Sequence, residues 1–176
     1  ILAALLLTLF LCWRFRLSFA AGAMASLIFD VTTTTSLLVI LGQEIDLNIV
    51  AALLTIIGYS LNDTIVIYDR IRETLRRENP DSPRPLPEII QEALGDTMSR
   101  TLLTAGTTLV AALALFLLGG PVIYGFALTM LIGVFMGTIS SLFVAAPMLP
   151  LFGDTLSFKT AVTLGVFERP GEHGVV

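Results

Sequence analysis

The chain has 176 residues, of which 55% are apolar and only 14% carry a charge, and its formal net charge is −4. Ordinary soluble domains carry about 25% charged residues, so this composition excludes that class. The ten basic residues lie in short islands and provide no surface that could follow a nucleic-acid backbone, so no nucleic-acid partner is expected. Cys12 is the single cysteine and cannot form an internal disulfide. The composition instead indicates a protein that lies mostly in lipid.

Long apolar runs predict an all-α transmembrane bundle. A helix needs about 20 apolar residues to cross a hydrocarbon core of about 30 Å. Four runs reach that length, whereas the first run is too short to span, and we expect residues before Ile1 to complete it. A cleaved signal peptide is the alternative, but no basic region precedes the apolar stretch. Residues 1–155 form the predicted bundle, with segments at about 1–13, 17–41, 47–69, 101–118 and 122–149, a connection at 70–100 and a tail at 156–176.

The positions of the basic residues predict one orientation. With five crossings, all ten lie on the same side, in the turn before residue 17, the connection 70–100 and the tail. The loops 42–46 and 119–121 contain no Lys or Arg. The positive-inside rule therefore predicts a multi-pass protein of the cytoplasmic (inner) membrane, with its basic loops and C-terminus in the cytoplasm. From about Pro87 the sequence predicts one of two structures for the connection: an amphipathic helix that lies against the membrane or the bundle, or a solvated connector.

Two acidic residues, Asp30 and Asp63, lie inside the apolar runs. A carboxylate at membrane depth is costly, so such groups usually face the bundle interior and serve ions, protons or substrates. Ser26, Thr33 and Thr34 lie four residues before and three and four residues after Asp30, which gives its helix a polar face. The alternative for both acids is a structural polar contact between helices.

Asp63 lies about 9 Å inside the end of its span, and its face carries Ser60, Tyr59 and Thr55. The next span begins at Arg100 and carries a stripe of threonines. Arg100 either extends to the membrane interface, as basic residues at helix ends ordinarily do, or reaches inward to Asp63. The stripe consists of Thr101, Thr104 and Thr108.

Motifs of conventional enzymes are absent from the sequence. It contains no nucleophile–base pair, no glycine-rich phosphate loop and no cluster of His or Cys with ligand spacing. The sequence therefore predicts neither an enzyme nor a metal or organic cofactor. Any energy must come from ions that move through the bundle or from a partner.

Residues 56–73, IIGYSLNDTIVIYDRIRE, closely resemble a characteristic motif of SecF, the protein-export membrane subunit family. Residues 99–109, SRTLLTAGTTL, resemble the start of the next helix in that family. Asp30 matches the acidic position of the preceding helix, where relatives often have His before the Asp, whereas Phe29 stands here. The resemblance extends to about residue 155.

The resemblance implies half of an RND-type transporter with six helices, of which this chain would hold helices two to six. It could be a separate SecF or the end of a fused SecDF. The family's role implies an accessory subunit of the Sec preprotein translocase that uses the proton-motive force to promote export. The implied partners are SecD, the SecYEG translocon, the preprotein and membrane lipid, and the coupling ion is a proton, with sodium as the alternative.

In the mechanism that this implies, Asp63 binds and releases a proton and Arg100 stabilises its ionised form. Asp30 shapes the polar interior or passes protons on. We also expect four supporting polar side chains, those of Ser60, Asn62, Thr64 and Thr104. Two alternatives remain: half of an RND-type proton-coupled efflux or lipid transporter, and a passive scaffold with structural carboxylates.

Overall fold

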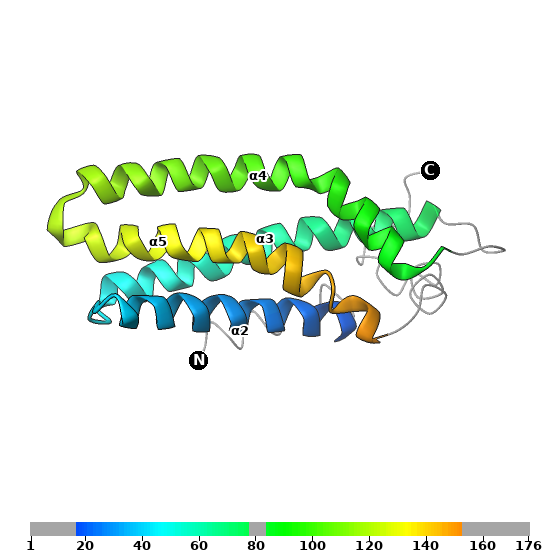
Figure 1. Cartoon of the computed structure of the whole chain (residues 1–176), viewed down its shortest axis with the longest axis horizontal. Helices are drawn as coiled ribbons and strands as arrows, with labels where there is room; N and C mark the ends of the chain where they lie inside the picture. Colours follow the sequence, from blue (N-terminus) through cyan, green and yellow to red (C-terminus); the bar gives the residue numbers. More distant parts are fainter. Residues whose placement is uncertain (1–16, 78–83, 153–176) are drawn as a thin grey trace, which may run out of the picture.

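The computed structural model describes residues 17–77 and 84–152, and within these ranges it is helical without strands (Figure 1). The expected first segment and tail lie outside the described residues. The elements are α2 (Leu17–Ile40), α3 (Leu47–Arg77), α4 (Leu86–Leu118), α5 (Gly120–Ser140), the π-helical turn η1 (Ser141–Ala145) and the 3₁₀ turn η2 (Leu149–Phe152).

All four α-helices are long and apolar enough to cross a membrane. The 31 residues of α3 and the 33 of α4 extend about 46 Å and 50 Å, which exceeds a hydrocarbon core of about 30 Å. The two helices are antiparallel neighbours, so both extend beyond the core at the same end, where the arginines cluster. We call this the basic end. The connection is thus largely a continuation of α3 to Arg77 and of α4 from Leu86.

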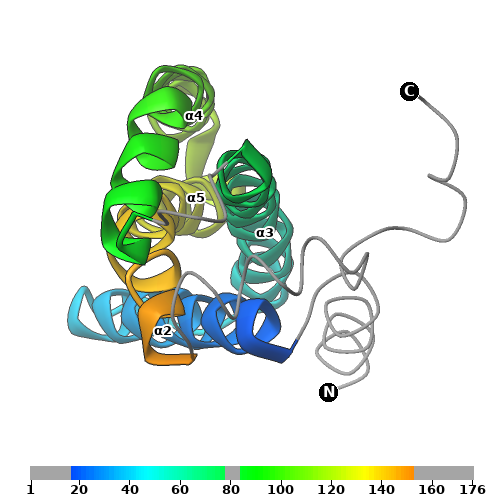
Figure 2. The same cartoon turned by 90° about the vertical axis from the view of Figure 1, so that its right-hand side faces the viewer.

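Helix α5 lies at the centre of the bundle. It contacts α2, α3 and α4, and the end-on view shows it between the other three helices (Figure 2). Small residues permit this position: a methyl group at Gly133 would overlap the side chain of Ile56, and one at Gly137 would lie 3.4 Å from Cβ of Ser60. These two glycines therefore bring α5 into close contact with α3.

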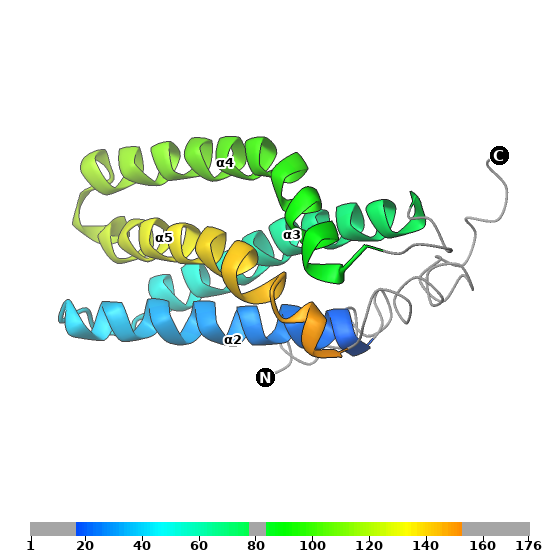
Figure 3. The same cartoon turned by 45° about the vertical axis from the view of Figure 1, so that its right-hand side comes forward.

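A hydrophobic core cluster lies at the basic end. It joins the start of α2, the end of α3, the start of α4 and the turns that follow α5. These turns cross from the end of α5 toward α2 (Figure 3). Leu86, Ile89, Ile90 and Ala93 are all buried there, so the first turns of α4 pack on the bundle. Tyr68 lies in the same cluster, fully buried.

Tight turns close the opposite end. Gly42, after α2, and Gly120, the first residue of α5, both adopt a φ of 72°, which favours glycine. The carboxylate of Asp46 accepts a 2.8 Å hydrogen bond from the N–H of Ile49 and so satisfies a free donor at the start of α3. Asn48 donates to the carbonyl oxygen of Val122 at 3.2 Å and so ties the start of α3 to the start of α5.

Candidate functional site

Asp30 lies at the junction of α2, α3 and α5 and is completely buried. The Ser60 hydroxyl of α3 donates a hydrogen bond to its Oδ2, and Ser140 at the end of α5 also lies against the carboxyl group. The hydroxyls of Ser26 and Ser140 are 2.9 Å apart. Residues from three helices therefore form one buried polar cluster, as the polar face of Asp30 predicted.

This cluster is incompletely hydrogen-bonded. Oδ1 of Asp30 and Oγ1 of Thr34, one turn further along α2, are buried and have no hydrogen-bond partner within the described part of the chain. A buried polar atom without a partner costs free energy, and an ionised one costs more. Such atoms occur at sites that exchange a proton and at sites that hold a water molecule or an ion.

Asp63 faces a different neighbour, α4. Its side chain is only 5% exposed, and Thr101, which is fully buried, is its hydroxyl neighbour on α4. Oδ2 of Asp63 and Oγ1 of Thr101 have no hydrogen-bond partner among the described residues. A second carboxyl group is thus enclosed between two helices, and one of its oxygens is available to accept a further hydrogen bond.

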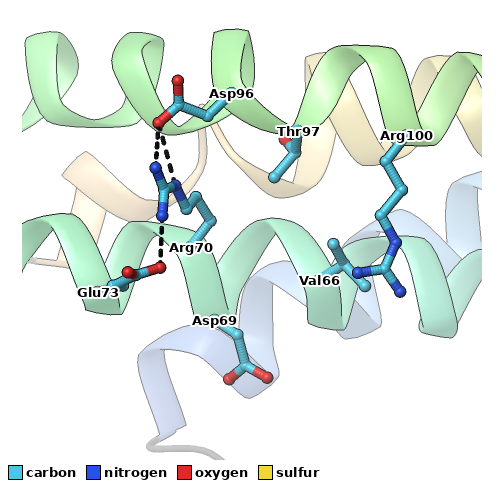
Figure 4. A pocket seen from close by; sticks show the side chains of 7 residues that line it. All are labelled: Val66, Asp69, Arg70, Glu73, Asp96, Thr97 and Arg100. Carbon is cyan, nitrogen blue, oxygen red and sulfur yellow. Dashed lines mark hydrogen bonds and ion pairs between the residues drawn. The ribbon is translucent and has the colours of Figure 1, made fainter.

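Arg100 lies on α4 just outside Asp63, toward the basic end. Its side chain is exposed, and its charge acts on Asp63, although the described residues show no ion pair between the two. Figure 4 shows its side chain extending from α4 toward Val66 of α3. The structure therefore places Arg100 beside the carboxyl group without direct contact.

The polar contact between α3 and α4 continues inward from Asp63. Tyr59 lies one turn deeper on α3, near Thr104 and Thr108 of α4. Both threonines also donate back to carbonyl oxygens of their own helix, at 3.0 Å and 2.9 Å. We call this run of polar side chains between the two helices, from Arg100 to Thr108, the α3–α4 seam.

At the basic end the seam opens into a groove of about 490 Å³. Arg70 of α3 extends across it, with its NH2 2.5 Å from Oδ2 of Asp96 on α4 and its NH1 2.5 Å from Oε2 of Glu73 (Figure 4). The groove is lined by Val66, Asp69, Arg70, Glu73, Asp96, Thr97 and Arg100.

The structure separates residues that the sequence grouped together. Ser60, expected beside Asp63, instead bonds to Asp30. Thr64 is buried, whereas Asn62 is exposed on the outside of α3 and does not face the buried carboxyl group. Ser60 and Asp63 are three residues apart, so they lie on adjacent flanks of one helix that face different neighbours.

Two residues of the site, Thr101 and Ser140, are not identified as site residues by the sequence. Thr101 belonged to the threonine stripe but was not singled out, although it is the hydroxyl neighbour of Asp63. Ser140 has no sequence signal, because its role depends on how α5 packs against α2. Within residues 17–77 and 84–152, no group of three or more His, Cys, Asp or Glu side chains could hold a metal ion.

Comparison with known proteins identifies the family. Residues 1–155 match the family described as protein export membrane protein SecD/SecF, C-terminal. The chain belongs to the SecD/SecF family. The SecF protein of Escherichia coli O157:H7 is 49% identical over 147 residues, which cover 83% of this chain and 45% of that protein. The SecF protein of Magnetococcus marinus is 50% identical over 159 residues, 90% of this chain and 50% of the relative.

Solved structures of SecDF share the fold. The crystal structure of SecDF from Thermus thermophilus matches with a TM-score of 0.77 and 37% identity, over 82% of this chain and 20% of that one. The chain thus spans about half the length of its SecF relatives and about a fifth of SecDF. Together with the four helices of spanning length, this makes the chain a multi-pass membrane protein with the SecF helical bundle.

Proposed function

We propose that the chain is part of an accessory subunit of the Sec preprotein translocase and uses the proton-motive force to promote protein export. Membership of the SecD/SecF family supports the role in export. SecD, or a SecD half of the same polypeptide, is the expected direct partner, because a relative in Brucella abortus is named protein translocase subunit SecDF. SecYEG and the preprotein are the further partners in this proposal.

The observation that carries the coupling mechanism is the environment of Asp63. Its carboxyl group is buried, its Oδ2 has no partner among the described residues, and the positive charge of Arg100 lies nearby. Burial favours a neutral carboxyl group, whereas a neighbouring guanidinium favours the ionised form. Because the two effects oppose each other, a small movement of Arg100 can load or release a proton.

Asp30 has a supporting role in this proposal. Its cluster is fully enclosed by α2, α3 and α5, and Ser60 links it to the helix that carries Asp63. Asp30 therefore either holds a proton that is passed to Asp63 or fixes the position of α3. Moving one charge through 100 mV supplies about 2.3 kcal/mol, enough to bias a two-state bundle.

The orientation follows from the charges. The arginines of α3 and α4 lie together at the basic end, which the positive-inside rule assigns to the cytoplasm. The groove then opens to the cytoplasm, and Asp63 lies inside the membrane on the cytoplasmic half of the bundle.

The test replaces Asp63 with Asn in the full-length protein with its partners. Asp63→Asn keeps the size of the side chain but cannot take up a proton at neutral pH, so proton-driven stimulation of export should be lost while assembly is unchanged. Glu44→Gln is the matched control, because Glu44 is an exposed carboxylate in the opposite loop. Normal stimulation of export by the Asp63→Asn protein, measured in inverted membrane vesicles, would contradict the mechanism.

A further inference from the structure

The groove at the basic end lies directly outside the proposed proton site. Val66 and Arg100 form its inner end, and Val66 is three residues, about 4.5 Å along the helix, from Asp63. Polar and charged side chains line the rest of it, so the groove suits water better than lipid. It provides a polar approach from the basic end toward Asp63.

Arg70 and Asp96 join the two walls of this groove. The guanidinium of Arg70 donates to Oδ2 of Asp96 from both Nε, at 3.0 Å, and NH2, at 2.5 Å. Asp96 lies one turn before Arg100 on α4, on the same side of the helix (Figure 4). This contact therefore sets the spacing of α3 and α4 beside the residue that controls Asp63.

We propose that the Arg70–Asp96 pair is a gate that controls the access of water and hydrated protons from the groove to Asp63. This inference rests on the proposed function and adds the regulation of the same site. When the pair is closed, α3 and α4 are held together outside Arg100. When it opens, the groove widens and Arg100 moves with the turn of α4 that carries Asp96.

The pair has the properties that a gate requires. The side chains of Arg70 and Asp96 are 30% and 43% exposed, so water can replace their contact at low cost. Arg70 also pairs with Glu73 on its own helix, at 2.5 Å, and keeps this partner when Asp96 leaves. Arg70 can therefore alternate between one and two acidic partners without ever being left unpaired.

Two other acidic groups of the groove have ion-pair partners on their own helix. Asp69 lies on α3 and pairs with Arg72 of the same helix at 3.1 Å. Glu73 is held by Arg70 and Arg77, which are also on α3. Arg100, the remaining charged group that lines the groove, lies inside the gate.

The experiment measures access to the groove directly. Val66→Cys is introduced into a cysteine-free full-length protein, reconstituted with its partner in lipid nanodiscs so that both membrane faces are open to reagent. The rate of modification by a charged, membrane-impermeant methanethiosulfonate is then compared between the parent and Asp96→Asn. A cysteine at the exposed Ser99 reports any general change in reactivity.

Asp96→Asn and Arg70→Gln should each raise the rate at position 66 about two- to fivefold, the change expected when an exposed ion pair is lost. Asp96→Glu restores the pair and should return the rate toward that of the parent. Glu92→Gln is the matched control, because it removes an exposed pair with Arg84, 2.8 Å apart, outside the groove.

Equal rates in the parent and Asp96→Asn would overturn the gate, as would an equal increase in Glu92→Gln. Neither result depends on export or on a proton gradient. A failed gate therefore leaves the Asp63→Asn result standing, and loss of the Asp63 mechanism is detected separately by the export assay.

Discussion

Ser60 of α3 donates its hydroxyl hydrogen to the carboxyl group of Asp30 on α2, and both side chains are almost completely buried. This bond joins α2 to α3 inside the buried polar cluster that also contains Ser26 and Ser140. It also separates the two acidic residues, because Asp30 is bonded to Ser60 while Asp63 faces α4.

Removing this donor should destabilise the bundle. Ser60→Ala removes the hydroxyl donor that α3 supplies to Oδ2 of Asp30, which costs about 1–3 kcal/mol when the carboxyl group stays buried. The free energy of unfolding, measured by denaturant titration in detergent, should fall by that amount. Ser36→Ala, on the exposed side of α2, is the control and should change stability by less than about 0.5 kcal/mol.

Two replacements of Asp30 should separate its structural role from its role in proton coupling. Asp30→Asn keeps an oxygen that accepts the hydrogen bond from Ser60 and should fold and assemble normally. Asp30→Leu leaves Ser60 without an acceptor and should lower the Tm. If export driven by the proton gradient is normal in Asp30→Asn, the residue does not carry protons and its contribution is structural.

The close packing of α5 on α3 predicts that a larger side chain at the contact will destabilise the protein. A methyl group at Gly133 overlaps Ile56, so Gly133→Ala should cost about 1–3 kcal/mol of stability through overpacking. Ile56→Val should recover part of that loss when combined with it, and a double-mutant cycle measures the coupling. Gly106→Ala is the matched control, since no atom lies within 4 Å of the added methyl group, and it should not destabilise the protein.

Helix periodicity and residue composition predicted much of this fold. Runs of about 20 apolar residues located the spans, and the polar face of Asp30 correctly indicated contact with protein, because a lipid-facing carboxylate would be too costly. The sequence could not show which neighbour each flank of α3 would face. Ser60 and Asp63 are only about 60° apart around the helix, and only the packing of α4 and α5 decides that they belong to different clusters.

Local details of the helices could not be predicted from the sequence either. The π-helical turn η1 has no clear residue signal, yet it positions the carbonyl oxygen of Ala145, which accepts a 3.0 Å hydrogen bond from the buried hydroxyl of Tyr68. Asn62 was expected near Asp63 because it precedes it in the motif. Consecutive residues point about 100° apart on a helix, and Asn62 lies on the exposed side.

The contribution of the hydrogen bond at the π turn to stability can be tested by removing one hydroxyl group. Tyr68→Phe keeps the edge-to-face contact with Phe19, whose ring centroid is 5.0 Å away, but removes the donor to Ala145. We expect a loss of about 1–2 kcal/mol, measured by denaturant unfolding. Tyr124→Phe should be nearly neutral, because Tyr124 is 39% exposed. A neutral Tyr68→Phe would show that the π turn does not depend on this bond.

The proposed orientation predicts opposite labelling of two loops. Single cysteines at Gln43 and Glu88 lie at opposite ends of the bundle, so an impermeant thiol reagent should reach them from opposite faces of sealed vesicles. Glu88 should react from the cytoplasmic face. Labelling of both from the same face would contradict the topology.

The position of Ser60 and Asp63 on one helix has a mechanical consequence. Because α3 is a continuous helix from Leu47 to Arg77, a rotation about its own axis must displace both side chains at once. Such a rotation would stretch the bond to Asp30 while it changes the distance from Asp63 to α4. This rotation thus changes the surroundings of both carboxyl groups together and cannot change only one of them. A rotation that begins at the centre of the membrane is transmitted along α3 to its charged end.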